Sequence, residues 1–174
     1  MDSGQSSTIV DRDRAANGAF SPVSSQSQEA GPSTMRVAII SLGGELFTID
    51  LKSVREVFVV ESITPVPGMP SGLVGVTNLR GTVIPLLDLR PMFALDSDAT
   101  LQYAVVVKHE NWQVGILVDR VPEIRILSKD QFLPVPAGRG EGVFPLVSTV
   151  VKLEDRLRGL LEASVVLSHF EGTD

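Results

Sequence analysis

The sequence predicts an all-β fold, and three observations lead to that expectation. Short apolar, β-branched runs recur along the chain, with glycine or polar pairs between them at close intervals. Helical patterns are few and short, and one pattern of residues occurs twice. Many short strands joined by closely spaced turns are typical of a β-sandwich or a β-barrel.

Four β-hairpins account for most of the expected strands. The first begins with "MRVAIISL", turns at Gly43 and Gly44, and continues with "ELFTID". The second is "LVGVTNLRGTVIPLL", and the third is "LQYAVVVKHENWQVGILVD", which turns around residues 109–111. The fourth, "LVSTVVKLEDRLRGLLEA", turns at Glu154 and Asp155. Apolar runs that flank glycine or polar pairs in this way indicate hairpins.

The repeated pattern follows two of these hairpin strands. "FTIDLKSVREVF" (47–58) and "GILVDRVPEIRIL" (115–127) share an apolar strand end, an aspartate, and then a valine and a glutamate between apolar residues. "PLLDL" at Pro85 and "GLLEA" at Gly159 also occupy matching places. The repeat predicts that each half of the chain forms one small barrel from a hairpin, a short helical turn and another hairpin.

Composition disfavours several classes of function. A net charge of −6 and a pI near 4.9 argue against binding to nucleic-acid phosphates. The chain has no cysteine, so disulfides and thiolate sites are excluded. His109 and His169 have no companion at a metal-ligand spacing, and phosphate-binding and nucleophile glycine motifs are missing. We therefore expect no metal, no cofactor and no catalysis.

The first 34 residues differ in character from the rest of the chain. They hold eight serines and no periodic apolar pattern, too little apolar surface to offset the entropy of ordering. The sequence predicts a disordered tail (1–34) and a folded domain (35–174). The tail is either a leader without function or a tether or modification site. With no signal-peptide pattern and no membrane-spanning run, we expect a cytoplasmic protein that meets a membrane only through a partner.

One arginine interrupts the apolar run of the second hairpin. "NLRG" places Asn78 and Gly81 at the outer positions of a four-residue turn, as a type I turn prefers. Leu79 and Arg80 then take its two central positions, so the guanidinium stands at the hairpin tip. Arginine is enriched at interface hot spots, so this tip is a candidate contact surface; a solvated turn arginine is the alternative.

Several other residues have local explanations. Ser53 and Glu56 fit the S-x-x-E capping box, which would keep the glutamate in a local role. Asp88 and Asp119 each precede a proline by three residues and are expected to be helix N-caps. Glycine permits positive φ and close backbone approach, which suffices to explain three glycines: Gly75, Gly81 and Gly115.

Three blocks in order resemble the CheW family of bacterial chemotaxis adaptors. They are "LFTIDLKSVREVF" with "TPVPGMPSGLVG" behind it, "GVTNLRGTVIPLLDLR", and "VGILVDRVPEI". The resemblance covers about residues 37–167. It implies two small five-stranded barrels packed side by side and a scaffolding role without catalysis.

The resemblance also implies partners and a site. Such adaptors bridge the cytoplasmic tip of a transmembrane chemoreceptor to the histidine kinase CheA, whose C-terminal regulatory domain has the same fold. An adaptor serving another kinase cascade, for pilus motility or a second-messenger output, is the alternative. The expected recruitment is to receptor arrays at the inner face of the membrane. The positions expected to contact receptor or kinase are Val54, Glu56, Gly75, Asn78, Leu79, Arg80, Gly115 and Ile124.

Overall fold

A computed structural model of the 174-residue chain describes residues 33–96, 98–136 and 146–171. The first strand begins at Thr34, one residue before the predicted domain start. The predicted disordered tail falls almost entirely on residues 1–32, outside the described residues, and stays a prediction.

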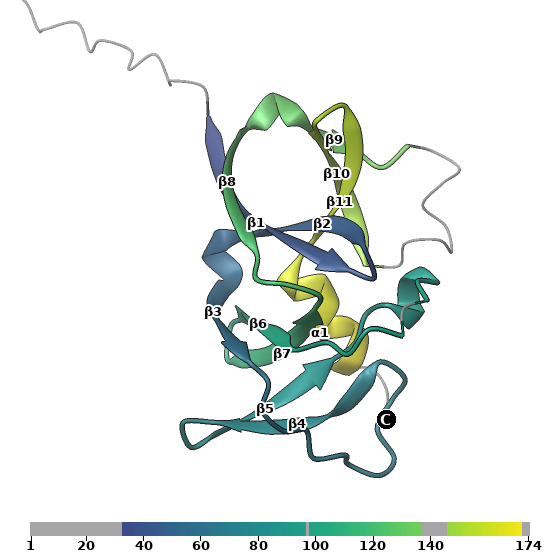
Figure 1. The fold of residues 1–174 in the computed structure, drawn as a ribbon. Helices are drawn as coiled ribbons and strands as arrows, with labels where there is room; N and C mark the ends of the chain where they lie inside the picture. Colours follow the sequence, from purple (N-terminus) through teal and green to yellow (C-terminus); the bar gives the residue numbers. More distant parts are fainter. Residues whose placement is uncertain (1–32, 97, 137–145, 172–174) are drawn as a thin grey trace, which may run out of the picture. The chain divides into compact units, whose positions relative to one another are not determined.

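Two mixed, mostly antiparallel sheets make up the fold (Figure 1). We call them the six-stranded lobe, with strand order β8-β1-β2-β11-β10-β9, and the five-stranded lobe, with order β3-β6-β7-β5-β4. The strands are β1 (Thr34–Leu42), β2 (Glu45–Asp50), β3 (Val54–Val59), β4 (Leu73–Leu79), β5 (Thr82–Leu87), β6 (Tyr103–His109), β7 (Trp112–Val118), β8 (Glu123–Ser128), β9 (Phe132–Pro134), β10 (Val147–Leu153) and β11 (Arg156–Leu161).

Helical structure in the described residues is short. Three 3-10 turns follow β2, β5 and β8, namely η2 (Leu51–Ser53), η3 (Pro91–Phe93) and η4 (Lys129–Gln131). One α-helix, α1 (Ala163–Glu171), follows the last strand. The predicted fold class, mostly β in two sheets with short helical turns, is confirmed. The predicted hairpins are β1–β2, β4–β5, β6–β7 and β10–β11, each antiparallel.

The prediction that each half of the chain forms its own barrel is wrong. The six-stranded lobe combines β1 and β2 with β8 to β11, and the five-stranded lobe combines β3 to β5 with β6 and β7. The exchange occurs at the two repeated segments. After β2 the chain crosses to pair β3 with β6, and after β7 it crosses back to pair β8 with β1. Each sheet is therefore completed by the other half of the chain.

The repeat itself is present in the strand register. β11 runs parallel to β2 with Leu160 opposite Thr48, and β5 runs parallel to β7 with Leu86 opposite Gly115. These pairings place "GLLEA" and "PLLDL" at equivalent positions, as expected. The lobes differ at one edge. The six-stranded lobe adds β9 beside β10, where the five-stranded lobe has an isolated bridge between Thr64 and Val76.

A single apolar cluster joins the lobes. It contains Ile40 and Phe47 from the six-stranded lobe, Val105 and Leu87 from the five-stranded lobe, and residues of α1. Helix α1 buries Ala163, Val166 and Leu167, the i, i+3, i+4 face of an amphipathic helix. It lies at the junction of the two sheets (Figure 1). Because burial of apolar surface dominates folding, this shared core makes the lobes stabilise each other.

Candidate functional site

The β4–β5 hairpin turns at Arg80 and Gly81, not at Leu79 and Arg80. Leu79 pairs with Thr82 across the ladder, and φ is +50° at Arg80 and +85° at Gly81. Positive φ at both central residues is the pattern of a type I′ turn, whose twist matches that of the strands. The predicted type I turn is therefore wrong, although Arg80 does stand at the tip. Asn78 holds the turn, since its Oδ1 accepts a hydrogen bond from Gly81 N at 2.8 Å.

At this tip Arg80 forms an ion pair with Glu56. The two residues belong to separate sequence motifs, and the structure brings them together. Glu56 lies on β3, opposite Val106 of β6. Its side chain is 35% exposed, while that of Arg80 is 72% exposed. We call Val54, Glu56, Asn78, Leu79 and Arg80 the Arg80 rim.

The ion pair spans the two ends of the five-stranded sheet. β3 and β4 are the outermost strands of the hydrogen-bonded order, yet Glu56 reaches the β4–β5 tip. Beside it, the Thr64–Val76 bridge and a 2.8 Å hydrogen bond from Thr77 Oγ1 to Ser62 O join the same edges. The sheet therefore curls into a barrel at this rim. An exposed ion pair contributes only about 0–1 kcal/mol to stability, so folding alone does not require the arginine.

The capping box predicted for Ser53 and Glu56 is not formed. Ser53 ends the η2 turn, and Glu56 lies within β3. The residue that caps η2 is Asp50, whose Oδ1 accepts a hydrogen bond from Lys52 N at 2.9 Å. Because β3 pairs with β6, tertiary strand pairing prevails over the local capping pattern. The Glu56 carboxylate is thus available at the surface.

Two of the expected contact residues, Gly75 and Gly115, are buried backbone positions. Gly75 has φ +154°, and a Cβ there would lie 2.5 Å from Thr64 O. A Cβ on Gly115 would lie 2.8 Å from Leu86 Cδ2 in the barrel interior. Both glycines therefore permit the close packing that was expected of them, and neither presents a side chain to a partner.

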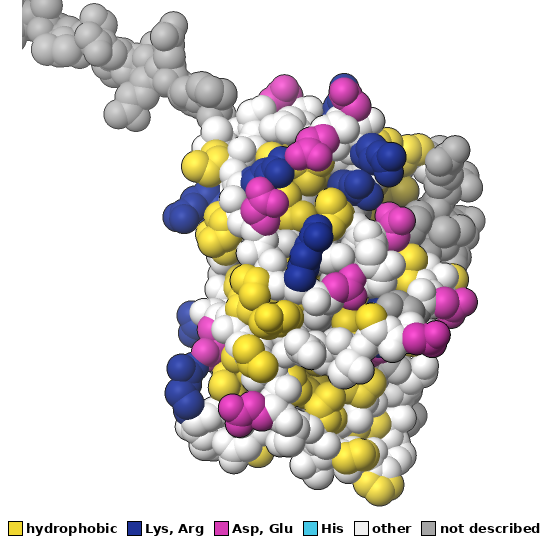
Figure 2. Space-filling model, viewed as in Figure 1, with side chains coloured by type: hydrophobic (Ala, Val, Ile, Leu, Met, Phe, Trp, Pro, Cys, Tyr) yellow, Lys and Arg dark blue, Asp and Glu magenta, His cyan; other side chains and the backbone are white. Residues whose placement is uncertain are grey.

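The eighth expected residue, Ile124, lies on the other lobe. It is on β8 and is 57% exposed. Ile126 on the same face of β8, and Val57 and Val59 on β3, are also exposed. β8 and β3 lie along one side of the molecule in Figure 1, and Figure 2 shows apolar side chains along that side. The edge strands of both lobes thus offer aliphatic surface beside the Arg80 rim.

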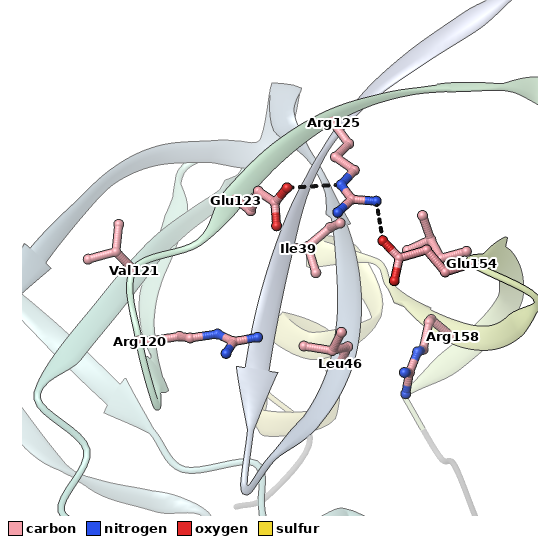
Figure 3. A pocket seen from close by; sticks show the side chains of 9 residues that line it. Ile39, Leu46, Arg120, Val121, Glu123, Arg125, Glu154 and Arg158 are labelled. Atoms are coloured by element: carbon pink, nitrogen blue, oxygen red, sulfur yellow. Dashed lines mark hydrogen bonds and ion pairs between the residues drawn. The ribbon is translucent and has the colours of Figure 1, made fainter.

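The six-stranded lobe has a rim equivalent to the Arg80 rim (Figure 3). Glu123 lies opposite Ile39, which holds the same place in β1 that Val106 holds in β6, so Glu123 corresponds to Glu56. The β10–β11 tip, Glu154 and Asp155, corresponds to Arg80 and Gly81 and also has positive φ.

The charges at this second rim are arranged differently. Arg125 bridges the two acids, with Nε 3.0 Å from Glu123 Oε1 and NH1 2.8 Å from Glu154 Oε1. The hydrogen bonds that Arg125 donates, first to Glu154 and then to Glu123, raise the pKa of Arg125. We call Glu123, Arg125 and Glu154 the Arg125 rim. It borders a pocket of about 340 Å³ that Arg120 and Arg158 also line.

Asp88 and Asp119 do not cap helices, contrary to the prediction. Asp88 binds the Arg90 side chain, with Oδ2 2.8 Å from NH2, and Arg90 itself precedes η3. Hydrogen bonding to Asp88 raises the pKa of Arg90 despite burial. Asp119 precedes a strand, β8, and its carboxylate accepts hydrogen bonds from the end of β1 and from the β1–β2 turn.

Asp119 is a structural residue that sequence reasoning assigned wrongly. Ser41 Oγ, Gly43 N and Gly44 N donate to it at 2.7, 3.0 and 2.8 Å. Burial raises the pKa of Asp119, but these hydrogen bonds and the Arg90 guanidinium outweigh burial and lower it overall. No local pattern links Asp119 to a turn some seventy-five residues earlier, so only the fold reveals these hydrogen bonds.

The described residues contain no group of three or more His, Asp or Glu side chains placed to hold a metal ion. None of the helices in the described ranges is long and apolar enough to cross a membrane. What the surface offers is a charged rim beside exposed aliphatic strands, which is chemistry suited to binding another protein.

The fold and this rim define a two-lobed β-barrel binding domain. Comparison with known proteins places it further. Residues 36–171 match the family model described as CheW-like domain, so the chain belongs to the CheW family.

Individual relatives support the same assignment. The chemotaxis protein CheW of Klebsiella aerogenes is 36% identical over 100 residues, 56% of this chain and 60% of that protein. The match thus spans less than two thirds of the Klebsiella protein. Protein PilI of Pseudomonas aeruginosa is 28% identical over 93 residues, 52% of each chain. The crystal structure of the scaffolding protein TtCheW from Thermoanaerobacter tengcongensis superimposes with a TM-score of 0.65 and 26% identity, covering 73% of this chain and 88% of that one.

Proposed function

We propose that this protein is a chemotaxis adaptor that couples transmembrane chemoreceptors to a CheA-type histidine kinase. Membership of the CheW family and the likeness to a scaffolding protein support this function. The observation that carries the choice of surface is the Arg80–Glu56 pair, an exposed ion pair at a barrel rim. The protein then acts by binding and not by catalysis, beside the cytoplasmic tips of receptors at the inner face of the membrane.

Receptor recognition would combine charge with apolar contact. A helical receptor tip can lay its apolar stripe on the aliphatic edge strands, to which Ile124, Val57 and Val59 contribute. Arg80 uses one NH2 group on Glu56 and keeps further N–H donors for a partner carboxylate. Charge complementarity then fixes the register while the apolar contacts supply affinity.

The remaining members of the Arg80 rim have supporting parts in this proposal. Asn78 holds the turn that points Arg80 outward. Val54 and Leu79, both half-buried, flank the charged pair and contribute apolar contact. Gly75 and Gly115 act indirectly, since they shape the barrel. The kinase regulatory domain, of the same fold, would meet the strand ends of one barrel.

The folded domain of residues 35–174 would perform both contacts, and residues 1–34 would act as a tether or be dispensable. Repeated weak contacts in a receptor array raise the local concentration of each partner, so modest affinities can still give a firm assembly.

Co-sedimentation of the full chain with a receptor-tip fragment and a CheA-type kinase tests the proposal. Wild-type protein, with or without residues 1–34, should bring kinase and receptor into one pellet. Arg80→Glu should leave the circular dichroism spectrum unchanged and reduce receptor binding about thirtyfold, roughly 2 kcal/mol. Wild-type affinity in a folded Arg80→Glu variant would exclude the Arg80 rim as the receptor contact.

Similarity to PilI favours one alternative, an adaptor in a pilus-motility cascade. The genes beside this one separate the two outputs. Flagellar and receptor-methylation genes would support chemotaxis, and pilus genes would support the alternative.

A further inference from the structure

A groove lies between the β6–β7 turn and helix α1, and it shares no residue with the Arg80 rim. Its volume is about 400 Å³. Trp112, the first residue of β7, forms one wall, and α1 forms the other through Ser164, Ser168 and Val165. The helix packs on β6 and β7, so the groove is part of the folded five-stranded lobe.

Trp112 is not a core residue. Its side chain is 61% exposed, although tryptophan is the largest apolar side chain and is highly buried on average. It pairs with His109 across the hairpin end, where the ladder does not need an aromatic residue. An exposed indole beside a groove is typical of a protein contact point, because Trp is enriched among interface hot spots.

The groove is negatively charged. Glu110 in the turn and Glu171 at the end of α1 both line it and are both exposed. Within the part of the chain that the structure describes, neither glutamate forms an ion pair, and the one basic residue that lines the groove is His109, with neither Lys nor Arg beside it. The carbonyl end of α1 adds partial negative charge near Glu171.

We propose that this groove binds an arginine side chain presented by a protein partner. The guanidinium would lie on the exposed face of Trp112, the aromatic residue with the strongest attraction for cations. Glu110 and Glu171 would accept its N–H donors, and the aliphatic stem would contact Val165. The proposal stands independently of the receptor-coupling function, because it uses a different surface.

Trp112 is the only tryptophan in the chain, so its indole N–H resonance reports on this groove alone. The full chain can be titrated with acetyl-Leu-Arg-Leu-amide and with the same peptide carrying citrulline, which keeps the shape and removes the charge. The arginine peptide should shift the indole signal saturably and bind at least about fivefold more tightly than the citrulline peptide, since an exposed cation–π contact and ion pairs each contribute modestly.

Variants locate the effect. Glu110→Gln together with Glu171→Gln should remove the preference for arginine while the amide spectrum of the core stays unchanged. Glu61→Gln, at an exposed glutamate outside the groove, is the matched control and should keep the preference. Equal binding of the arginine and citrulline peptides, or an arginine preference that survives the double substitution, would overturn the proposal.

Discussion

The Arg80 rim and the Arg125 rim occupy the same place in two lobes of one repeat, yet they carry their charges differently. In the five-stranded lobe a single acid, Glu56, meets a basic hairpin tip. In the six-stranded lobe the tip is acidic, and Arg125 on the edge strand bonds both Glu123 and Glu154. Arg80 thus keeps donors for a partner, whereas Arg125 is engaged on two sides within its own lobe. Equivalent geometry therefore gives two rims that differ in how many arginine N–H donors stay available at the surface.

The largest difference expected between the lobes is in the first strand of each tip hairpin, β4 and β10. Gly75 and Thr149 each follow a register shift at equivalent places in β4 and β10. A side chain at Gly75 would collide with Thr64 O, whereas Thr149 pairs with Pro134 of β9 in an ordinary ladder. Gly75→Thr should lower the free energy of unfolding by about 3 kcal/mol or more.

Urea denaturation measures this effect. Thr149→Gly is the matched control and should lower the free energy of unfolding by about 1 kcal/mol or less. Equal losses in the two variants would mean that the close approach at Gly75 is not specific to the five-stranded lobe.

The next difference concerns the aspartates that begin the two crossovers. Asp119 accepts three hydrogen bonds, one from Ser41 of β1 and two from the β1–β2 turn, whereas Asp50 accepts one, from Lys52 N. Asp119→Asn should therefore lower the free energy of unfolding by about 2 kcal/mol, and Asp50→Asn by less than about 1 kcal/mol.

The pH dependence of the same residue gives a second readout. The pKa of Asp119 is lowered on folding, so its stabilisation is complete above the ordinary carboxyl pKa of 3.8 and is lost as the pH falls through the lower folded-state pKa. When the pH is lowered from 5, the melting temperature of the wild-type protein should fall. The fall should be smaller in Asp119→Asn. If the melting temperatures of wild type and Asp119→Asn fell equally with pH, the role given to the Asp119 hydrogen bonds would be contradicted.

A smaller difference is expected at the two edge-strand acids. Glu56→Ala should weaken receptor-fragment binding about tenfold, because it removes one of the charged groups that fix the position of the partner on the rim. Glu123→Ala should change it less than about twofold. Titration calorimetry with both variants compares them directly, and a stronger effect at Glu123 would reverse the assignment of the rims.

The smallest effects should be on stability at either rim. Arg125→Gln and Arg80→Gln each break exposed ion pairs, which contribute little. We expect the melting temperature of each variant to stay within about 2 °C of wild type. A larger fall in Arg80→Gln would show that the arginine is retained for folding.

The sequence predicted the elements that depend on local patterning. All four hairpins follow apolar alternation around turn residues, and Arg80 stands at its tip as expected. The residue pair that turns, however, depends on backbone twist, so the type I′ geometry at Arg80 and Gly81 was missed.

What the sequence could not supply was set by contacts distant along the chain. The exchange of strands between lobes arises where β3 pairs with β6 and β8 with β1, which no local pattern encodes. Because β3 pairs with β6, Glu56 lies in a strand and not in a capping box. Because the chain enters β8 after Asp119, this aspartate bonds the β1–β2 turn and does not cap a helix. The family resemblance singles out Glu56 and Arg80 as contact residues, which stays a prediction. Their mutual ion pair depends on the closure of the barrel and could not be predicted from the sequence.

One measurement tests the central claim most directly: titration of a receptor-tip fragment with Arg80→Glu and Glu154→Arg, the tip residues of the two equivalent hairpins. If the Arg80 rim is the docking face, Arg80→Glu loses about thirtyfold in affinity and Glu154→Arg stays within about twofold of wild type, with both variants folded. Equal affinities for the two folded variants, or a loss confined to Glu154→Arg, would contradict it.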